Sequence, residues 1–159
     1  MISFRNINKS DYREVCSFFS NKRELNYTFP KTSYPFDARQ LQNIISTRSE
    51  ATMLLLNEIP AGFADLYNIT NGKECFIGNF VISKHCRKMG LSKVLLEEMI
   101  HKGITLYNVQ KICIHCWCEN TAALLLYEKF CFKPVEIVVR EFDKEKIPVL
   151  LLEKSINPE

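Results

Sequence analysis

The chain has 159 residues, of which 47% are hydrophobic and 25% are charged, and its formal net charge is +3. This length and composition predict one globular domain over residues 1–159 that buries a core without disulfides or metals. The net charge is too small to indicate a nucleic-acid partner, and no apolar run approaches the roughly 20 residues that span a bilayer. Because the N-terminus lacks an export signal and the seven cysteines are not clustered, we expect a cytoplasmic protein with reduced thiols.

The first third of the chain predicts one strand and two helices. Apolar and polar residues alternate over residues 2–7, which is typical of a strand. Ser10 is placed to cap a helix that we expect to end near Ser20, and Asp37 is placed to cap a second helix. Between the helices, residues 21–36 hold two prolines and four aromatic residues without a regular period. This stretch is either a connecting loop whose aromatics cover the edge of the core, or a wall that faces a substrate.

Three β-rich runs follow these helices. The runs over residues 51–57 and 60–69 are separated by a short turn, which indicates a hairpin. Asn71-Gly72 is the dipeptide that most strongly favours a two-residue hairpin turn, and it leads into a third run that begins at Glu74. We therefore expect three consecutive antiparallel strands.

A basic turn over residues 87–92 connects the third strand to a leucine-rich helix that we expect to end at Gly103. Backbone N–H groups in such a loop and in the first helical turn have no helical partner, and the helix dipole favours negative charge there. A strand, a loop and a helix in this order form an anion site. The spacing Arg-x-x-Gly-x-Ser is neither a P-loop nor a G-x-G-x-x-G fingerprint.

The last third predicts a strand over residues 111–117, a helix capped by Asn120, and a final hairpin formed by residues 135–142 and 147–152. The complete order is β-α-α-β-β-β-α-β-α-β-β. It indicates an α/β fold with a mixed, mostly antiparallel sheet flanked by helices.

The strand over residues 111–117 carries Cys113, His115 and Cys116, and Cys118 follows it, a group that suggests zinc. A strand places Cys113 and His115 on one face and Cys116 and Cys118 on the other, so four tetrahedral ligands cannot converge. We therefore expect no metal, and we interpret these cysteines as small buried hydrophobic residues.

Two motifs resemble those of the GNAT N-acetyltransferase superfamily. The loop over residues 87–92 resembles its Arg/Gln-x-x-Gly-x-Gly/Ala pyrophosphate loop, with serine at the last position. Residues 120–132, NTAALLLYEKFCF, resemble its Asn-x-x-Ala-x-x-Leu-Tyr-x-x-x-Gly-Phe pattern, with Cys131 in place of the glycine. The motifs stand in the order that the family requires, and the resemblance covers residues 76–132.

The resemblance implies the GNAT fold and an enzyme that transfers an acetyl group from acetyl-CoA to a primary amine of a small molecule or protein. The amine would attack the thioester directly in a ternary complex. The pantetheine arm would lie along a strand edge as an added strand, and loop amides would hold the pyrophosphate. The cofactor-binding residues expected on this basis are Phe80, Val81, Ile82, Arg87, Lys88, Met89, Gly90, Leu91, Ser92, Lys93 and Asn120.

The resemblance also implies that Tyr127 is the general acid that protonates the departing thiolate. The general base must accept a proton from the attacking amine, and the chemistry of His115 fits this role. Asn79 and Glu119, acting through water, are alternatives. No motif identifies the acceptor amine.

Two other functions are consistent with parts of the sequence. A protein of the same fold could bind acyl-CoA as a sensor or regulator without turnover. Basic residues over 84–93 could instead bind nucleic acid, although no RRM, zinc-finger or basic-helix pattern supports this. We expect no nucleic-acid partner, no membrane association, and a monomer or a homodimer.

Overall fold

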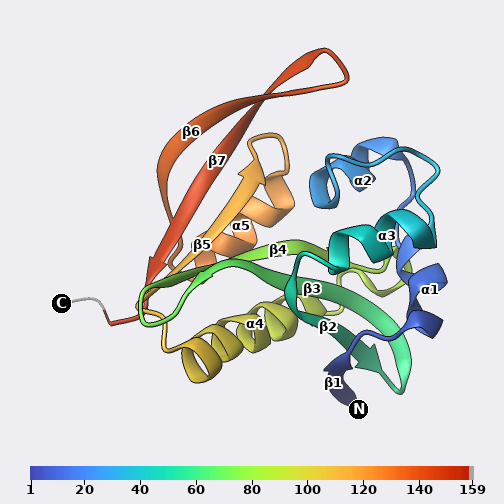
Figure 1. The fold of residues 1–159 in the computed structure, drawn as a ribbon, viewed down its shortest axis with the longest axis horizontal. Coiled ribbons are helices and arrows are strands. Elements are labelled where there is room, and N and C mark those ends of the chain that lie inside the picture. The colour runs from blue at the N-terminus through green and yellow to red at the C-terminus, as the bar shows by residue number, and fades with distance from the viewer. Residues whose placement is uncertain (158–159) are drawn as a thin grey trace.

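A computed structural model describes residues 1–157, which form a seven-stranded mixed sheet with helices on both faces (Figure 1). The strands are β1 (Ile2–Asn6), β2 (Ser49–Leu56), β3 (Ile59–Thr70), β4 (Glu74–Ile82), β5 (Lys111–Trp117), β6 (Lys133–Phe142) and β7 (Glu145–Ser155). The helices are α1 (Tyr12–Cys16), α2 (Lys22–Thr28), α3 (Ala38–Ile45), α4 (Leu91–Tyr107) and α5 (Thr121–Lys129), with short 3-10 turns η1 (Lys9–Asp11) and η2 (Lys84–Cys86). The sheet order is β1-β2-β3-β4-β5-β7-β6, and only the β4–β5 pair is parallel. The predicted fold class is confirmed.

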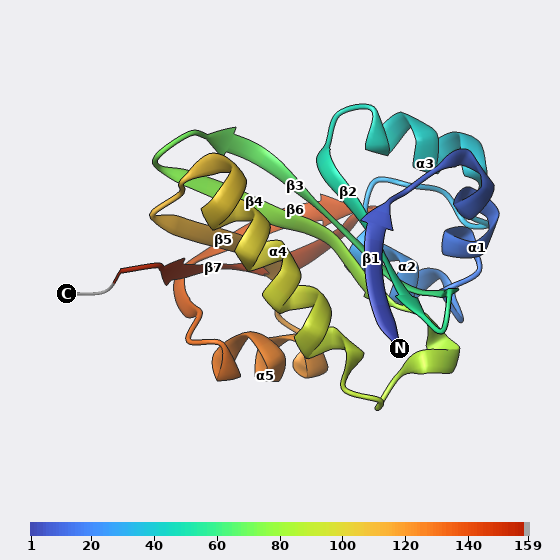
Figure 2. The ribbon, with the colours of Figure 1, turned by 90° about the horizontal axis from the view of Figure 1, so that it is seen from below.

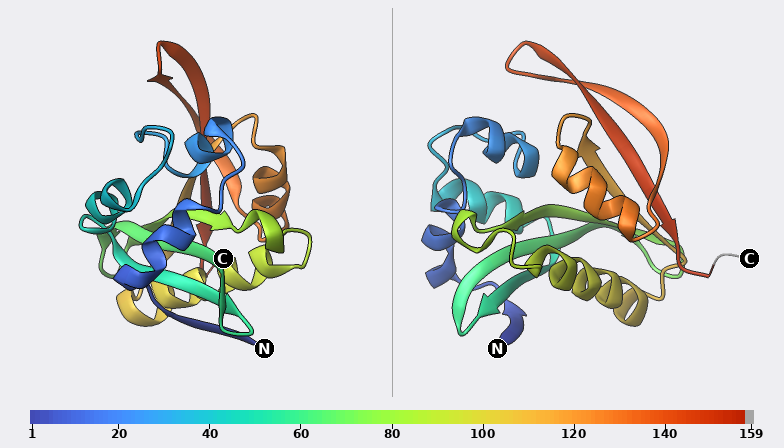
Figure 3. Two further views of the ribbon diagram at one scale, coloured as in Figure 1. Left: turned by 90° about the vertical axis from the view of Figure 1, so that its right-hand side faces the viewer. Right: turned by 180° about the vertical axis from the view of Figure 1, so that it is seen from behind.

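Strand alternation sends side chains into two cores, one on each face of the sheet. On β2, Met53 and Leu55 pack against the side of α1, α2 and α3, together with Phe63 of β3. Leu54, between them, faces the opposite core, which contains Leu95 of α4. Figures 2 and 3 show α4 and α5 on the face away from the three N-terminal helices. None of the helices within residues 1–157 is long and apolar enough to cross a membrane.

The parallel pair β4–β5 is short, and this feature positions the site. Its pairing ends at Ile77 and Ile114, although β4 continues to Ile82 and β5 to Trp117. Asn79 adopts a φ of 51° just beyond the last pair, as happens where a bulge interrupts a ladder. Further along, β4 pairs only with β3 and β5 only with β7, so the two strands separate (Figure 1).

The first helical segment begins and ends earlier than the sequence predicts. Asn8, rather than Ser10, provides the cap, because its side-chain oxygen accepts a hydrogen bond from the Ser10 N–H at 3.0 Å. The helix α1 ends at Cys16, not near Ser20. The predicted cap at Ser10 is therefore wrong by two residues. Several polar residues that can cap a helix follow one another here, and the sequence alone does not tell which of them does so.

The interpretation of residues 21–36 as a connecting loop is wrong for its first half, which forms α2. Asn21 caps this helix, and its side chain accepts from the Glu24 N–H at 3.0 Å. The cap and the acidic first turn favour a helix locally. The aromatic residues that follow obscure this pattern because they repeat without a helical period.

The predicted end of α4 at Gly103 is also wrong. The helix continues to Tyr107 and ends at Asn108, which adopts a left-handed φ of 50°. A Cβ atom at Gly103 would lie 3.0 Å from Sγ of Cys75 on β4. Glycine therefore serves here to let the helix approach the sheet, not to terminate it.

Candidate active site

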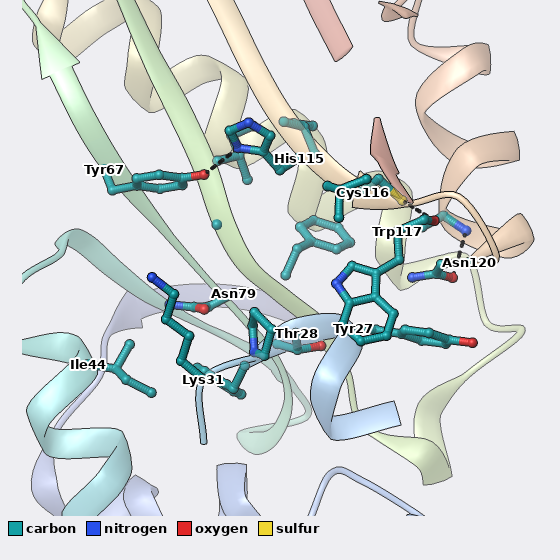
Figure 4. A pocket seen from close by; sticks show the side chains of 18 of the residues that line it. Tyr27, Thr28, Lys31, Ile44, Tyr67, Asn79, His115, Cys116, Trp117 and Asn120 are labelled. Atoms are coloured by element: carbon teal, nitrogen blue, oxygen red, sulfur yellow. Dashed lines mark hydrogen bonds between the residues drawn. The ribbon is translucent and has the colours of Figure 1, made fainter. Parts of the chain in front are cut away.

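A cavity of about 450 Å³ lies where β4 and β5 separate (Figure 4). Residues 77–80 of β4 and residues 114–117 of β5 form its two sides. Residues 27–32, at the end of α2 and in the loop after it, form a third wall. Residues 21–36 are interpreted above as either a loop or a wall that faces a substrate. The central part of this stretch borders the cavity.

The helix α2 is attached across the open ends of the separated strands. Arg23 forms a two-pronged ion pair with Glu119, with N–O distances of 2.5 and 2.7 Å, and a second pair with Glu145 at the start of β7 at 3.1 Å. The ring of Tyr27 packs edge-on against Trp117 of β5 at 5.6 Å between centroids. These contacts hold the third wall against the end of β5 and against the hairpin.

Tyr127 lies in the cavity wall on α5, with 5% of its surface exposed. The rings of Phe80 and Phe132 hold it edge-on, at centroid distances of 6.2 and 5.9 Å. Burial, and then the neighbouring Cys116, raise the pKa of this phenol far above its usual range. Its hydroxyl makes no hydrogen bond to a protein group within residues 1–157. Tyr127 is therefore a protonated donor without a protein acceptor.

The start and end of α5 fit the motif that contains Tyr127. Asn120 caps the helix, since its side-chain oxygen accepts from the Ala123 N–H at 3.4 Å, and the same side chain borders the cavity. Cys131 adopts a left-handed φ of 64° just after the helix. Cys131 thus adopts the left-handed backbone conformation for which glycine is usually favoured at this position.

The expected cofactor residues of β4 lie on the separated part of the strand. Phe80 borders the cavity, and Val81 is buried on the opposite face. Val81 and Ile82 pair with β3, whereas no strand within residues 1–157 pairs with the other edge of β4 over Phe80–Ile82. That edge can accept an extended chain as an added strand.

The loop before α4 presents backbone N–H groups at a helix N-terminus. Gly90 is the N-cap with a left-handed φ of 78°, and it has no side chain with which to cap the helix. Lys88 is also left-handed, with a φ of 64°. The N–H groups of Leu91, Ser92 and Lys93 in the first turn are therefore available to an anion. Met89 is exposed in the same loop.

Arg87 has a protein partner. Its Nη1 lies 2.6 Å from Oε1 of Glu24 on α2, and Nη2 lies 3.4 Å from the carbonyl oxygen of Phe18. The guanidinium holds the pKa of Glu24 below its usual value. Arg87 thus connects the loop to the N-terminal helices, and its role toward the cofactor stays a prediction.

His115 lies on β5 with both ring nitrogens engaged. Nδ1 is 3.1 Å from the hydroxyl of Tyr67 on β3 (Figure 4). Nε2 is 3.4 Å from Nη2 of Arg140 on β6. Phe76 stacks on the ring at 5.5 Å between centroids. Burial, and then Arg140, lower the pKa of His115 below its ordinary value. The imidazole is thus held neutral at neutral pH.

The structure separates the two alternative bases. Asn79 is buried at the cavity, and its amide nitrogen donates to Asp65 at 2.5 Å. Glu119 is not among the cavity residues; its carboxylate accepts from Arg23 in the ion pair described above. Of the three base candidates, His115 and Asn79 border the cavity.

Sequence reasoning missed a polar group that lies beside these residues. Asp65 on β3 is fully buried, and burial raises its pKa to about 6, while Arg48 and Asn79 oppose the rise. The Arg48 guanidinium lies 3.5 Å from Asp65 and 4.1 Å above the ring centre of Tyr67. The sequence did contain a signal for this residue, namely a single aspartate within an apolar run. Aspartate is rarely fully buried without a partner, so its presence there indicates a polar site.

The cysteines of β5 do not form a metal site or a reactive thiol. Within residues 1–157 no group of three or more His, Cys, Asp or Glu side chains is arranged to hold a metal. Burial raises the pKa of Cys113 and of Cys116 to about 12. Both thiols are therefore protonated at neutral pH and are weak nucleophiles.

Comparisons with known proteins bear on the family and the fold of the chain. A family model described as the acetyltransferase (GNAT) family matches residues 9–132. The solved structure of spermidine N-acetyltransferase from Vibrio cholerae, in complex with CoA and spermine, has a TM-score of 0.80 and 18% identity, covering 97% of this chain and 95% of that chain. A GNAT-family acetyltransferase from Bacillus anthracis has a TM-score of 0.81 and 15% identity, covering 97% and 94%. At these identities the likeness shows the fold. No curated protein matches the chain.

Proposed function

The chain belongs to the GNAT acetyltransferase family, and we propose that it transfers the acetyl group of acetyl-CoA to a primary amine by direct attack in a ternary complex. The observation that carries this proposal is the separation of β4 from β5 beyond Ile77 and Ile114. It leaves an unpaired strand edge on one side of a cavity whose wall contains Tyr127. A thioester bound along that edge would lie within reach of the phenol.

The cofactor would bind to three features that follow one another along the chain. The edge of β4 over Phe80–Ile82 would pair with the amides of the pantetheine arm. The first-turn amides of α4, together with Lys88 and Lys93, would bind the pyrophosphate, and Gly90 would let the backbone approach it closely. Asn120 borders the same cavity and would contact the arm through its free amide nitrogen.

The chemical step forms a C–N bond and breaks a C–S bond. The neutral amine attacks the thioester carbonyl carbon, and backbone N–H groups of β4 stabilise the negative charge that develops on its oxygen. The tetrahedral species expels the CoA thiolate, which takes a proton from Tyr127. Because Tyr127 is buried and has a raised pKa, it is fully protonated at neutral pH and therefore has a proton to give when the thiolate forms beside it.

The proton lost by the amine would pass to His115. This residue lies on β5 opposite the separated part of β4, and the surroundings hold it neutral. Its Nε2 lone pair currently accepts from Arg140 at a long 3.4 Å. A shift of that guanidinium would open the lone pair to the amine or to an intervening water.

The test is release of CoA thiol from acetyl-CoA by the purified protein with a broad panel of primary amines. Turnover with at least one amine, lost in Tyr127→Phe while CoA binding persists, is the expected result. Binding of CoA without turnover across the panel would instead identify a non-catalytic acyl-CoA sensor. Absence of CoA binding would contradict both functions.

A further inference from the structure

The charged side chains that border the cavity are all cationic. Among the described residues they are Lys31 in the loop after α2, Arg48 just after α3, and Arg140 on β6, and no aspartate or glutamate accompanies them. Figure 4 shows Lys31 extending into the cavity. Arg48 and Arg140 lie beside Tyr67 and His115, respectively, whereas Lys31 enters the cavity from the loop after α2.

Two of the three cations contact neighbouring ring side chains. Arg48 lies over the ring of Tyr67 at 4.1 Å, and Arg140 lies 3.4 Å from His115, which is itself bonded to Tyr67. A Cβ atom at position 78 would lie 2.7 Å from Nη1 of Arg48 and 2.8 Å from the Tyr67 ring. The bare backbone of Gly78 thus makes the space in which this guanidinium and this ring lie.

A nearby carboxylate partly offsets the charge of Arg48, whereas the charges of Lys31 and Arg140 have no such partner among residues 1–157. Asp65 lies 3.5 Å from Arg48, although burial raises its pKa to about 6. Within residues 1–157, no carboxylate lies within ion-pair distance of Arg140 or Lys31. Both side chains border the cavity, so each is able to pair with an anionic group that enters it.

We propose that the acceptor is a primary amine that itself carries a carboxylate, as an α-amino acid does, and that Arg140 and Lys31 bind this carboxylate. The inference rests on the proposed acetyl transfer and specifies its second substrate. A guanidinium matches a carboxylate with two parallel, charge-assisted hydrogen bonds. A polyamine, by contrast, would bring further positive charge to Lys31, Arg48 and Arg140. The spermine of the Vibrio cholerae complex therefore does not represent the acceptor of this chain.

Binding of a carboxylate would also change the state of His115. The guanidinium of Arg140 donates to Nε2, and a carboxylate is a far stronger acceptor than a neutral imidazole. An acceptor that draws Arg140 toward itself frees the Nε2 lone pair for the proton of its own amine. Acceptors without the carboxylate leave Nε2 bonded to Arg140. They should therefore have a lower kcat as well as a higher KM.

The test compares matched acceptors that differ only in the carboxylate. The common α-amino acids, their amides, and spermidine are assayed with acetyl-CoA by release of CoA thiol. We expect the best acceptor to be an amino acid whose kcat/KM exceeds that of its own amide by roughly tenfold or more, the value of one charge-assisted contact. The α-amino group of an amino-acid amide is less basic than that of the free amino acid, so more of it is in the reactive, unprotonated form. This difference favours the amide and therefore works against the expected result.

Equal or better turnover of the amides, or preference for spermidine, would overturn the carboxylate proposal and leave the acetyl transfer standing. Absence of turnover with every amine, in a protein that binds CoA, would overturn both. These two failures are distinguishable because only the first shows acetylated product.

Variants assign the contact to residues. Arg140→Gln and Lys31→Gln should each reduce the ratio of acid to amide kcat/KM severalfold. Arg39→Gln removes the same charge from an exposed position on α3 outside the cavity, and it should leave the ratio unchanged. An unaltered ratio in both cavity variants would contradict the assignment. Retained CoA affinity in each variant checks that the fold is intact.

Discussion

The guanidinium of Arg140 donates to Nε2 of His115 across 3.4 Å. Because a guanidinium has donors and no acceptor, Nε2 carries no proton, and the single ring proton lies on Nδ1, facing the Tyr67 oxygen. Protonation of the ring would bring a second positive charge against Arg140. The pair therefore keeps a candidate base neutral in the middle of a cationic cavity.

The pH dependence of turnover should show this pairing. Burial and Arg140 lower the pKa of His115 below its ordinary 6.5, so kcat/KM should fall only when the pH drops below that value. Arg140→Gln removes the cation, and the inflection should move to higher pH. An inflection that stays in place or moves down in this variant would contradict the assignment.

Asp65 has a pKa of about 6 and could produce an inflection in the same range. His115→Gln separates the two groups, because it abolishes the inflection only when the imidazole is the titrating base. Persistence of the same profile in His115→Gln would exclude His115 as the base.

Tyr127→Phe should lower kcat by about a hundredfold, the usual contribution of a positioned general acid. The ring packing against Phe80 and Phe132 is retained in the variant, so the dissociation constant for CoA, measured by calorimetry, should stay within about twofold. Tyr34→Phe, at a residue that is half exposed and outside the cavity, is the matched control. A Tyr127→Phe enzyme with normal kcat would show that another group protonates the thiolate.

Lys93→Gln should weaken CoA binding severalfold and reduce its dependence on salt, since an exposed lysine contributes through long-range attraction to the pyrophosphate. Pantetheine, which lacks the pyrophosphate, should bind the variant and the parent protein equally. Lys73→Gln, in the turn before β4, is the control for loss of one charge elsewhere. Equal weakening of pantetheine would place Lys93 away from the phosphates.

Asp65→Asn should change the pH dependence of stability. The folded-state pKa of Asp65 is raised from 3.8 to about 6, so the folded protein binds this proton more tightly than the unfolded chain does. The native carboxyl thus contributes stability at low pH that is lost as the pH rises through about 6. Between about pH 7 and pH 5, the unfolding free energy of the parent protein should rise by about 1 kcal/mol relative to Asp65→Asn. Denaturant titrations at both pH values measure this, and an opposite trend would mean that Arg48 dominates.

Elements with a local pattern were predictable, and elements that depend on distant contacts were not. The strand β5 has the predicted bounds because turn residues flank an apolar run, and Asp37 and Asn120 cap their helices as predicted. Gly103 was misassigned because a glycine that ends a helix and one that approaches a strand look alike in sequence. Only the contact with Cys75 distinguishes them.

The same distinction divides the candidate site. The proposed cofactor half lies on a strand, a loop and a helix that are consecutive in the chain, so a short motif marks it. The proposed acceptor half brings Arg48, Tyr67, His115 and Arg140 together from four separate segments. None has a sequence neighbour that indicates its role, and only the folded chain places them side by side.

The chain contains one tryptophan, and it borders the cavity. Trp117 stacks on Phe142 of β6 at 5.1 Å, meets Tyr27 of α2 at 5.6 Å, and has the Arg23 guanidinium 5.1 Å from its ring centre. Its emission therefore arises from a single place, where α2, β5 and the hairpin meet. Trp117 fluorescence therefore reports ligand binding without an added label. Stopped-flow fluorescence can measure the rate at which either substrate binds, before the chemical step.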